Sequence, residues 1–293
     1  MERQLWRAIM VVLQEIDKPK FRPRCRFTSI MIVKVWFWAV LHDRPVLWAC
    51  QRHNWPPHVR RSEIPSPATM SRRLRSLDVR FVKEQIEKRV LRGNNSGNLV
   101  WIIDGKPLVI GGCSKDRQAG YGRAAASKAK GYKIHAIIGS NGTVPAWRLA
   151  PMNKDERSMG ERMLRTVENR GYVLADGNYD SNKLHARCDD RGNLQLVSPR
   201  RYGSDRGHGH RRQTVGRMRS KAILENPKPQ FGEGLMRQRE EIERFFANLT
   251  NWGGGLTHLP PWARTHRRVH RWVQAKLIFN ALKQHCKKTT YDV

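Results

Sequence analysis

The sequence predicts an α/β domain that follows an all-helical region, and three observations support this prediction. Through residues 1–92, apolar side chains recur every three or four positions, which is the spacing of helices with one buried face. From residue 99 onward, short apolar runs that end at acidic or turn-forming residues are typical of buried strands. Between these parts, residues 93–98 read Gly-Asn-Asn-Ser-Gly-Asn and predict a linker. We therefore expect a helical region at 1–92 and a sheet-containing domain at 99–293.

The first region contains a short basic helix between two longer apolar ones. Helical spacing of apolar residues predicts buried helices within 30–41 and 81–91. Between them, residues 64–77 begin with Pro and Ser and continue as a cationic helix. Its arginines are Arg72, Arg73 and Arg75. A basic helix of this kind is typical of the recognition helix of a helix-turn-helix, although the pattern also allows phosphate contact or a solvated surface.

The second region predicts the order strand, hairpin, helix, strand, helix, strand, helix. The strands are expected at 99–103, 172–175 and 194–197, and an Asn-Gly turn at 141–142 predicts a hairpin of 132–138 with 144–149. Helices are expected at 153–170, from about 182, around 239–246 and at 265–287. The last of these has one apolar stripe: Val269, Trp272, Val273, Leu277 and Leu282.

The composition indicates a polyanionic partner. The formal net charge is +31, from 56 Lys and Arg against 25 Asp and Glu, which favours a partner held through its phosphates. The five cysteines form no C-x-x-C pair, which disfavours a zinc ribbon or a disulfide framework and suits a reducing cytosol. The most apolar stretch, 30–41, is too short to span a bilayer, so we expect no membrane partner.

Three acidic residues have the sequence contexts that suit phosphoryl-transfer chemistry with two metal ions. Asp104 and Asp176 each end an apolar strand-like run, and Glu243 lies in a later helix. Two metals about 3.5–4 Å apart need carboxylates that project from rigid elements. Asp180 competes with Asp176 but better suits the N-cap of the next helix, and Glu240 competes with Glu243 because both lie on one helical face.

These acids stand in motifs that resemble those of bacterial insertion-sequence DDE transposases of the four and five groups. The matching segments are Asp104-Gly105, the Lys-x-Gly-x-Lys-x-His stretch that ends at His135, Asp176-Gly177-Asn178-Tyr179-Asp180-Ser181, and Arg239 with Ile242-Glu243-Arg244-Phe245-Phe246. The similarity covers roughly residues 99–284. Met236 and Thr250 stand where the family often has a Tyr and a basic residue.

The resemblance implies an RNase H-like mixed sheet flanked by helices, with the helical region as the DNA-binding part. It implies that Asp104, Asp176 and Glu243 hold two Mg²⁺ ions, for which Mn²⁺ can substitute. The expected partners are double-stranded DNA, namely the terminal inverted repeats of the element and the target, and a second copy of the chain in a synaptic homodimer. An RNase H-like nuclease without strand transfer, and a transposase-derived DNA-binding protein without catalysis, stay open as alternatives.

Further DNA contacts are expected beside the acids and in a basic insertion at 199–235. Lys133 and His135 alternate onto one face of the hairpin, and Arg239 lies one turn before Glu243. Residues 199–221 are rich in Gly and Arg and predict a mobile DNA clamp, although a plain surface loop is equally open. The arginines of this clamp are Arg200, Arg201, Arg211 and Arg212. Trp252, in a Gly-rich stretch, is a candidate for stacking on a base or for capping the core.

Overall fold

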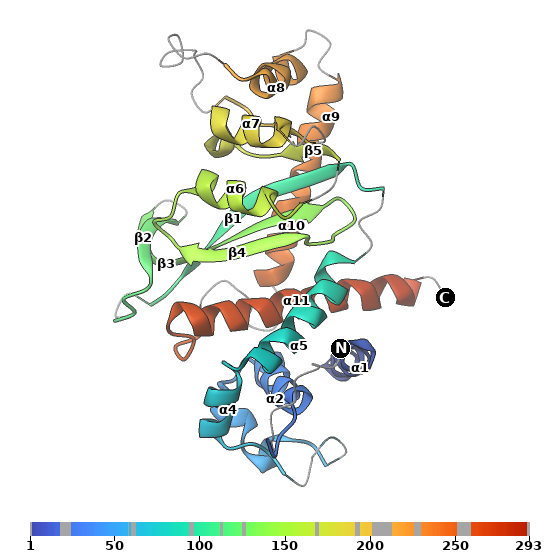
Figure 1. Ribbon diagram of the computed structural model, residues 1–293, viewed down its shortest axis with the longest axis vertical. Helices are drawn as coiled ribbons and strands as arrows, with labels where there is room; N and C mark the ends of the chain where they lie inside the picture. Colours follow the sequence, from blue (N-terminus) through green and yellow to red (C-terminus); the bar gives the residue numbers. More distant parts are fainter. Residues whose placement is uncertain are drawn as a thin grey trace. The chain divides into compact units, whose positions relative to one another are not determined.

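The chain folds into two compact units in a computed structural model (Figure 1). The structure describes residues 2–17, 25–57, 59, 63–93, 97–111, 114–124, 127–167, 170–190, 194–200, 213–225, 230–250 and 259–291. One unit combines Met1–Gly93 with Asn251–Val293, and the other is Asn94–Thr250. Across the described ranges, no helix combines the length and apolarity that a membrane crossing requires.

The first unit is entirely helical in its described residues, as predicted. Its elements are α1 (Glu2–Glu15), α2 (Ser29–Leu41), α3 (Val46–Ala49), η1 (Arg52–Asn54), α4 (Pro67–Arg73), α5 (Leu77–Glu87), η2 (Lys88–Arg92) and α11 (His266–Tyr291). Ser66 caps α4 by accepting a hydrogen bond from the backbone N–H of Thr69. Helix α2 is buried on almost every side, so it forms the centre of this unit.

The C-terminal helix α11 belongs to this helical unit, whereas the sequence analysis places it in a domain running from 99 to 293. Its predicted apolar stripe is buried, and it packs on α1, α2 and α5. The rings of Phe37 and Phe279 lie 5.3 Å apart, and the Gln274 amide donates to the Glu87 carboxylate at 2.6 Å. The apolar stripe was visible in the sequence, but its partner helices were not.

The second unit is a mixed six-stranded sheet with helices. Its strands are β1 (Val100–Val109), β2 (Gly120–Ala124), β3 (Ser127–Gly139), β4 (Ala146–Pro151), β5 (Gly171–Leu174) and β6 (Leu194–Val197). They pair in the order β2-β3-β1-β5-β6, and β4 also pairs with β3. Strands β5 and β6 run parallel to β1, whereas β3 is antiparallel to it. Strand β2 was not predicted, because its sequence Gly-Tyr-Gly-Arg-Ala lacks apolar alternation.

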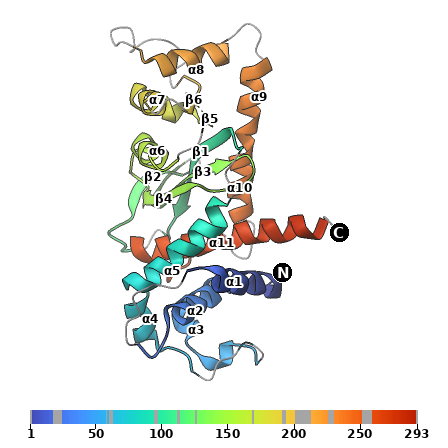
Figure 2. The same ribbon diagram turned by 45° about the vertical axis from the view of Figure 1, so that its right-hand side comes forward.

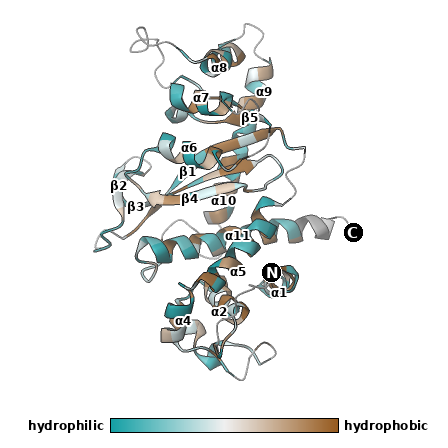
Figure 3. Cartoon of the chain, viewed as in Figure 1, coloured by the Kyte–Doolittle hydropathy of each residue, from teal (hydrophilic) through white to brown (hydrophobic). Residues whose placement is uncertain are grey.

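Helices lie on both faces of this sheet (Figure 2). They are α6 (Glu156–Leu164), η3 (Gly177–Tyr179), α7 (Asn182–Asp189), α8 (Val215–Glu225), α9 (Gln230–Gln238) and α10 (Glu240–Thr250). On one face, Trp101 and Ile103 of β1 form a buried core with Met163 of α6 and Leu184 of α7. Helix α10 packs on β1 from the other face. Figure 3 shows β1 and β5 as hydrophobic strands in this core.

Candidate active site

Asp104 lies inside strand β1 rather than at its end. The predicted strand 99–103 continues to Val109, because β3 pairs with β1 along that whole length. Successive side chains of a strand point to opposite faces. Because Trp101 and Ile103 point to the face covered by α6 and α7, Asp104 points to the face on which α10 packs. One oxygen of its carboxylate accepts a hydrogen bond of 2.7 Å from the backbone N–H of Gly105.

Asp176 lies two residues beyond the end of β5, on the strand that neighbours β1. Ile102 and Leu174 are paired in the parallel ladder, so Asp104 and Asp176 both follow this pair by two residues. The Asp176 carboxylate accepts hydrogen bonds from the backbone N–H and the side-chain amide of Asn178, at 2.9 and 3.1 Å. These bonds fix the carboxylate at the start of η3, beside the outgoing end of the strand.

Asp180, the competing acid, has a structural role. Its carboxylate is 3% exposed and receives two hydrogen bonds of 2.7 Å from the guanidinium of Arg217 on α8. The residue that caps α7 is Ser181, not Asp180. A carboxylate buried in a bidentate pair with arginine is not available to a ligand, which leaves Asp176 as the accessible acid of this motif.

The two aspartates are electrostatically coupled. Burial, together with smaller effects of the charges of Asp176 and Glu156, raises the pKa of Asp104 to about 6 against the lowering effects of the Gly105 N–H and Arg239. The raised pKa means that the negatively charged form of Asp104 is disfavoured in this buried position beside Asp176. Glu156, at the start of α6, was not identified as a site residue from the sequence, where it reads only as an acidic residue in the first turn of a helix.

Glu243 is exposed on α10, whereas Ile242 and Phe246 of the same helix are buried. Its side chain is 63% exposed, and a carboxylate oxygen lies 3.5 Å from the guanidinium of Arg239. Arg239 occupies the junction between α9 and α10, and its charge acts on Asp104. Glu240 instead pairs with Arg244 at 3.4 Å. Of the two competing glutamates, Glu243 is therefore the one linked through an arginine to the aspartates.

A divalent cation fits the donors that the structure brings together. Asp104 and Asp176 supply carboxylate oxygens, which are the ligands that Mg²⁺ prefers. The raised pKa of Asp104 shows that its negative charge is not fully balanced by nearby positive groups. Within the described ranges, no three His, Cys, Asp or Glu side chains are close enough together to hold a metal ion. Glu243 is accordingly not assembled with the aspartates into a three-carboxylate site.

The expectation for Lys133 and His135 requires correction. Asp104 pairs with Ala136 and Gly105 with His135, so Lys133 and His135 point to the sheet face opposite Asp104. His135 is fully buried, and burial, together with the charge of Lys133, lowers its pKa to about 4. Lys133 forms an ion pair with Glu156. A buried neutral imidazole on the covered face is not a DNA contact.

The basic insertion is partly an ordered helix. Residues 213–221 were expected within a mobile segment, but they lie mostly in α8, which packs on α7 and β6 and buries Arg217. Arg200 donates two hydrogen bonds of 2.6 Å to the Glu225 carboxylate. The pair of Arg217 with Asp180 explains why this part of the insertion is ordered. Asp180 lies too far from Arg217 in the sequence for this pairing to be predicted. The other predicted contacts lie outside the described residues: Arg201, Arg211, Arg212 and Trp252.

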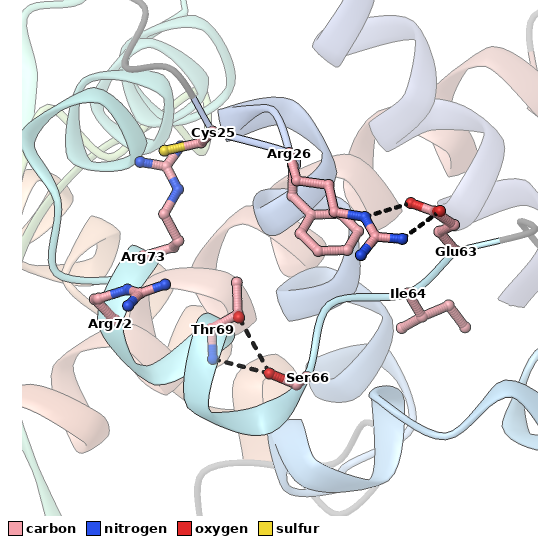
Figure 4. A pocket seen from close by; sticks show the side chains of 9 residues that line it. Cys25, Arg26, Glu63, Ile64, Ser66, Thr69, Arg72 and Arg73 are labelled. Atoms are coloured by element: carbon pink, nitrogen blue, oxygen red, sulfur yellow. Dashed lines mark hydrogen bonds and ion pairs between the residues drawn. The ribbon is translucent and has the colours of Figure 1, made fainter.

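The three arginines around α4 differ in their surroundings. Arg72 and Arg75 are exposed, whereas the Arg73 side chain is only 7% exposed and pairs with Asp78 at 2.6 Å. The interpretation of Arg73 as a DNA contact is therefore wrong, because its guanidinium is held by a buried carboxylate. Arg72 lines a cavity of about 630 Å³ that also contains Arg26 and Glu63 (Figure 4).

The sheet order, with aspartates on β1 and after the neighbouring parallel strand, is compatible with an RNase H-like domain. The model of a family described as Transposase DDE domain matches residues 95–278, which is more than half of the chain. The chain therefore belongs to the family of transposase DDE domains. A comparison with curated proteins finds no match.

Proposed function

We propose that this protein is a DNA transposase of the bacterial insertion-sequence type, which cleaves DNA at the ends of its element and joins the resulting 3′-hydroxyl to target DNA. The observation that carries this proposal is the pair Asp104 and Asp176 on adjacent parallel strands, with Arg239 and Glu243 following in α10 and its junction. The family match favours a transposase over a nuclease of another kind and over a protein that only binds DNA.

Asp104 and Asp176 would hold the divalent cations, Mg²⁺ in the first place. When bound, such ions activate water as a nucleophile and stabilise the charge on the leaving oxygen. The protein's own contribution is to fix the carboxylates. Strand β1 and the Gly105 N–H hold Asp104, and the start of η3 holds Asp176. Burial beside Asp176 disfavours the charged form of Asp104, so cation binding relieves this unfavourable state.

Glu243 is the third carboxylate of the proposed site, and Arg239 controls its availability. In the structure the two side chains form a pair on the exposed side of α10. A DNA phosphate is a better bidentate partner for arginine than an exposed carboxylate at 3.5 Å. DNA that takes over the Arg239 guanidinium would free Glu243 to join the aspartates. The site would then be completed only when DNA is present.

The test is metal-dependent cleavage of DNA that carries the inverted repeats flanking the gene. Asp104→Asn, Asp176→Asn and Glu243→Gln should each abolish cleavage and strand transfer while DNA affinity stays nearly unchanged. Glu241→Gln is the matched control, because Glu241 lies on the same helix and pairs with Arg244 rather than with Arg239. Cleavage that survives in Asp104→Asn or Asp176→Asn would exclude the proposed mechanism. If Glu240→Gln is inactive and Glu243→Gln is active, the third carboxylate is Glu240.

The proposed partners are the terminal inverted repeats, the target DNA and a second copy of the chain. The charge of +31 supports the DNA partners, since it is far larger than solubility requires. A dimer would allow two element ends to be cut and joined together. Strand transfer into a target plasmid would separate a transposase from a nuclease, because a nuclease leaves only cut ends.

A further inference from the structure

Among the residues that the structure describes, an arginine cluster on the helical unit has no carboxylate partner. Its members are Arg75, after α4, and Arg267, Arg268 and Arg271 in the first turns of α11. Within the described part of the chain, none of the four forms an ion pair with Asp or Glu, and the Arg75 guanidinium donates only to the Ser71 hydroxyl at 3.0 Å. The first turn of α11 contains no acidic residue. The two sequence segments that form this unit thus place their arginines close together.

This clustering is electrostatically unfavourable in the protein alone. Nη1 of Arg271 is buried and has no hydrogen-bond partner among the described residues. Burial, together with the neighbouring charges of Arg268, Arg75 and Arg267, lowers the pKa of Arg271 to about 10. The start of a helix also carries a partial positive charge, where acidic rather than basic residues are stabilising. An anion at this place would relieve all three effects.

A cavity of about 230 Å³ adjoins the cluster. Arg44, Arg268 and Arg271 line it together with the aromatic residues Trp36, Trp262 and Trp272. Leu47, also in the lining, is 57% exposed. The beginning of α11 is mainly hydrophilic in Figure 3. A site with arginines and an apolar wall suits a ligand that has a phosphate joined to a weakly polar group.

We propose that this site holds the sugar–phosphate backbone of DNA, with the phosphate on Arg75, Arg267, Arg268 and Arg271 and the deoxyribose against Trp262 and Leu47. The proposal rests on the proposed function and assigns part of its DNA contact to α11, near the C-terminal end of the sequence. Phosphate and sugar receive most hydrogen bonds that proteins make to DNA, and these contacts are independent of base sequence. The overall charge of +31 favours this occupant over an acidic protein segment.

The experiment measures the affinity of the full chain for a short labelled duplex of arbitrary sequence across a potassium chloride series. The test variant is Arg267→Ala/Arg268→Ala, since both side chains are exposed and their removal leaves the core intact. The matched control is Arg3→Ala/Arg7→Ala, which removes two exposed charges from α1 in the same unit. Each lost phosphate contact reduces the log–log salt slope by about 0.9, so the test variant should lose about 1.8. When the salt concentration rises tenfold, the affinity of the wild type should therefore fall about 60-fold more than the affinity of the test variant.

Two further variants separate charge from apolar contact. Arg267→Lys/Arg268→Lys should keep the wild-type slope, because both positive charges remain. Trp262→Ala should lower affinity without changing the slope, and its thermal unfolding is measured in parallel because Trp262 contacts Trp272 at 6.4 Å between ring centroids.

The outcomes distinguish this proposal from the function on which it rests. If the wild-type protein does not bind DNA, the proposed function fails. If the wild-type protein binds DNA but the test and control variants have equal slopes, the arginine cluster is not a DNA contact and this proposal alone fails. A change in sedimentation of the test variant with unchanged DNA affinity would likewise overturn it, and would identify the cluster as a contact between protein chains.

Discussion

Replacing Arg73 tests whether the basic helix α4 contains a structural arginine among surface ones. Arg73 donates to the Asp78 carboxylate at 3.0 and 2.6 Å, and the Asp78 side chain is 3% exposed. Burial alone would raise the pKa of Asp78, but hydrogen bonds from Arg73, Ser29 and Ser76 lower it to about 2. We expect Arg73→Met to destabilise the helical unit strongly. Arg72→Met, on the same helix but exposed, is the matched control.

The magnitude follows from the pKa of Asp78. A fall from 3.8 to about 2 corresponds to about 2.4 kcal/mol of stability, at about 1.4 kcal/mol per pKa unit. This contribution is fully present above pH 3.8 and is lost as the pH falls through 2. Removing Arg73 also leaves a buried carboxylate without its charged partner, so the expected loss at pH 7 is about 3–5 kcal/mol. Arg72→Met should change stability by less than about 0.5 kcal/mol.

The assay is urea unfolding followed by tryptophan fluorescence, because Trp36 and Trp38 are buried in α2 of the same unit. In Arg73→Met, burial should raise the pKa of Asp78, so the deficit should shrink as the pH is lowered from 7 to 4. If both variants unfolded at the same urea concentration, or if the deficit of Arg73→Met did not depend on pH, the pair of Arg73 with Asp78 would not contribute the stability assigned to it. DNA affinity should fall in Arg72→Met without loss of stability.

Three further results are expected. Because the pKa of Asp104 is about 6, cleavage at a fixed low Mg²⁺ concentration should decline as the pH falls below 6. In metal-free protein above pH 6, Asp104→Asn should be more stable than wild type by at most about 3 kcal/mol. A lower stability of this variant in urea unfolding at pH 7.5 would contradict the assigned burial of Asp104. Arg217→Met should destabilise the sheet unit by about 3–5 kcal/mol and Arg219→Ala, on the exposed side of α8, by less than about 0.5 kcal/mol, so equal melting temperatures would show that the Asp180 pair contributes little. The log–log salt slope of DNA binding should be steeper than about −3, and a shallower slope would mean that most of the positive charge faces away from DNA.

The sequence predicted the strands that carry the two aspartates because each signal is local. Asp104 and Asp176 follow apolar runs, and the Asn-Gly turn marked the β3–β4 hairpin. The helix that carries Glu243 was likewise predicted from the spacing of apolar residues, although spacing alone did not separate Glu243 from Glu240. The spacing of apolar residues predicts which side chains of one helix or strand share a buried face, and it does not predict contacts between elements.

Features that depend on distant partners were not predictable. Arg217 reads as one more basic residue of a polar loop, yet it pairs with Asp180, 37 positions earlier. Arg73 is indistinguishable in sequence from Arg72, and only the position of Asp78 after the helix turn separates them. His135 was placed correctly on the face of Lys133, but the pairing register with Asp104 decides that this is the covered face.

The helical unit is assembled from two segments that lie on either side of the sheet unit in the sequence. During synthesis, residues 1–93 leave the ribosome long before α11 can pack on them. Until then, apolar residues of α2 such as Phe37 lack the contacts that Phe279 later supplies. The sheet unit, by contrast, is continuous and has its complete core once Thr250 has emerged. Translation order therefore lets the aspartates be positioned before the helical unit is complete. A chain that stops short of α11 would lack the contacts of this helix in the core of that unit and three of the four arginines of the cluster.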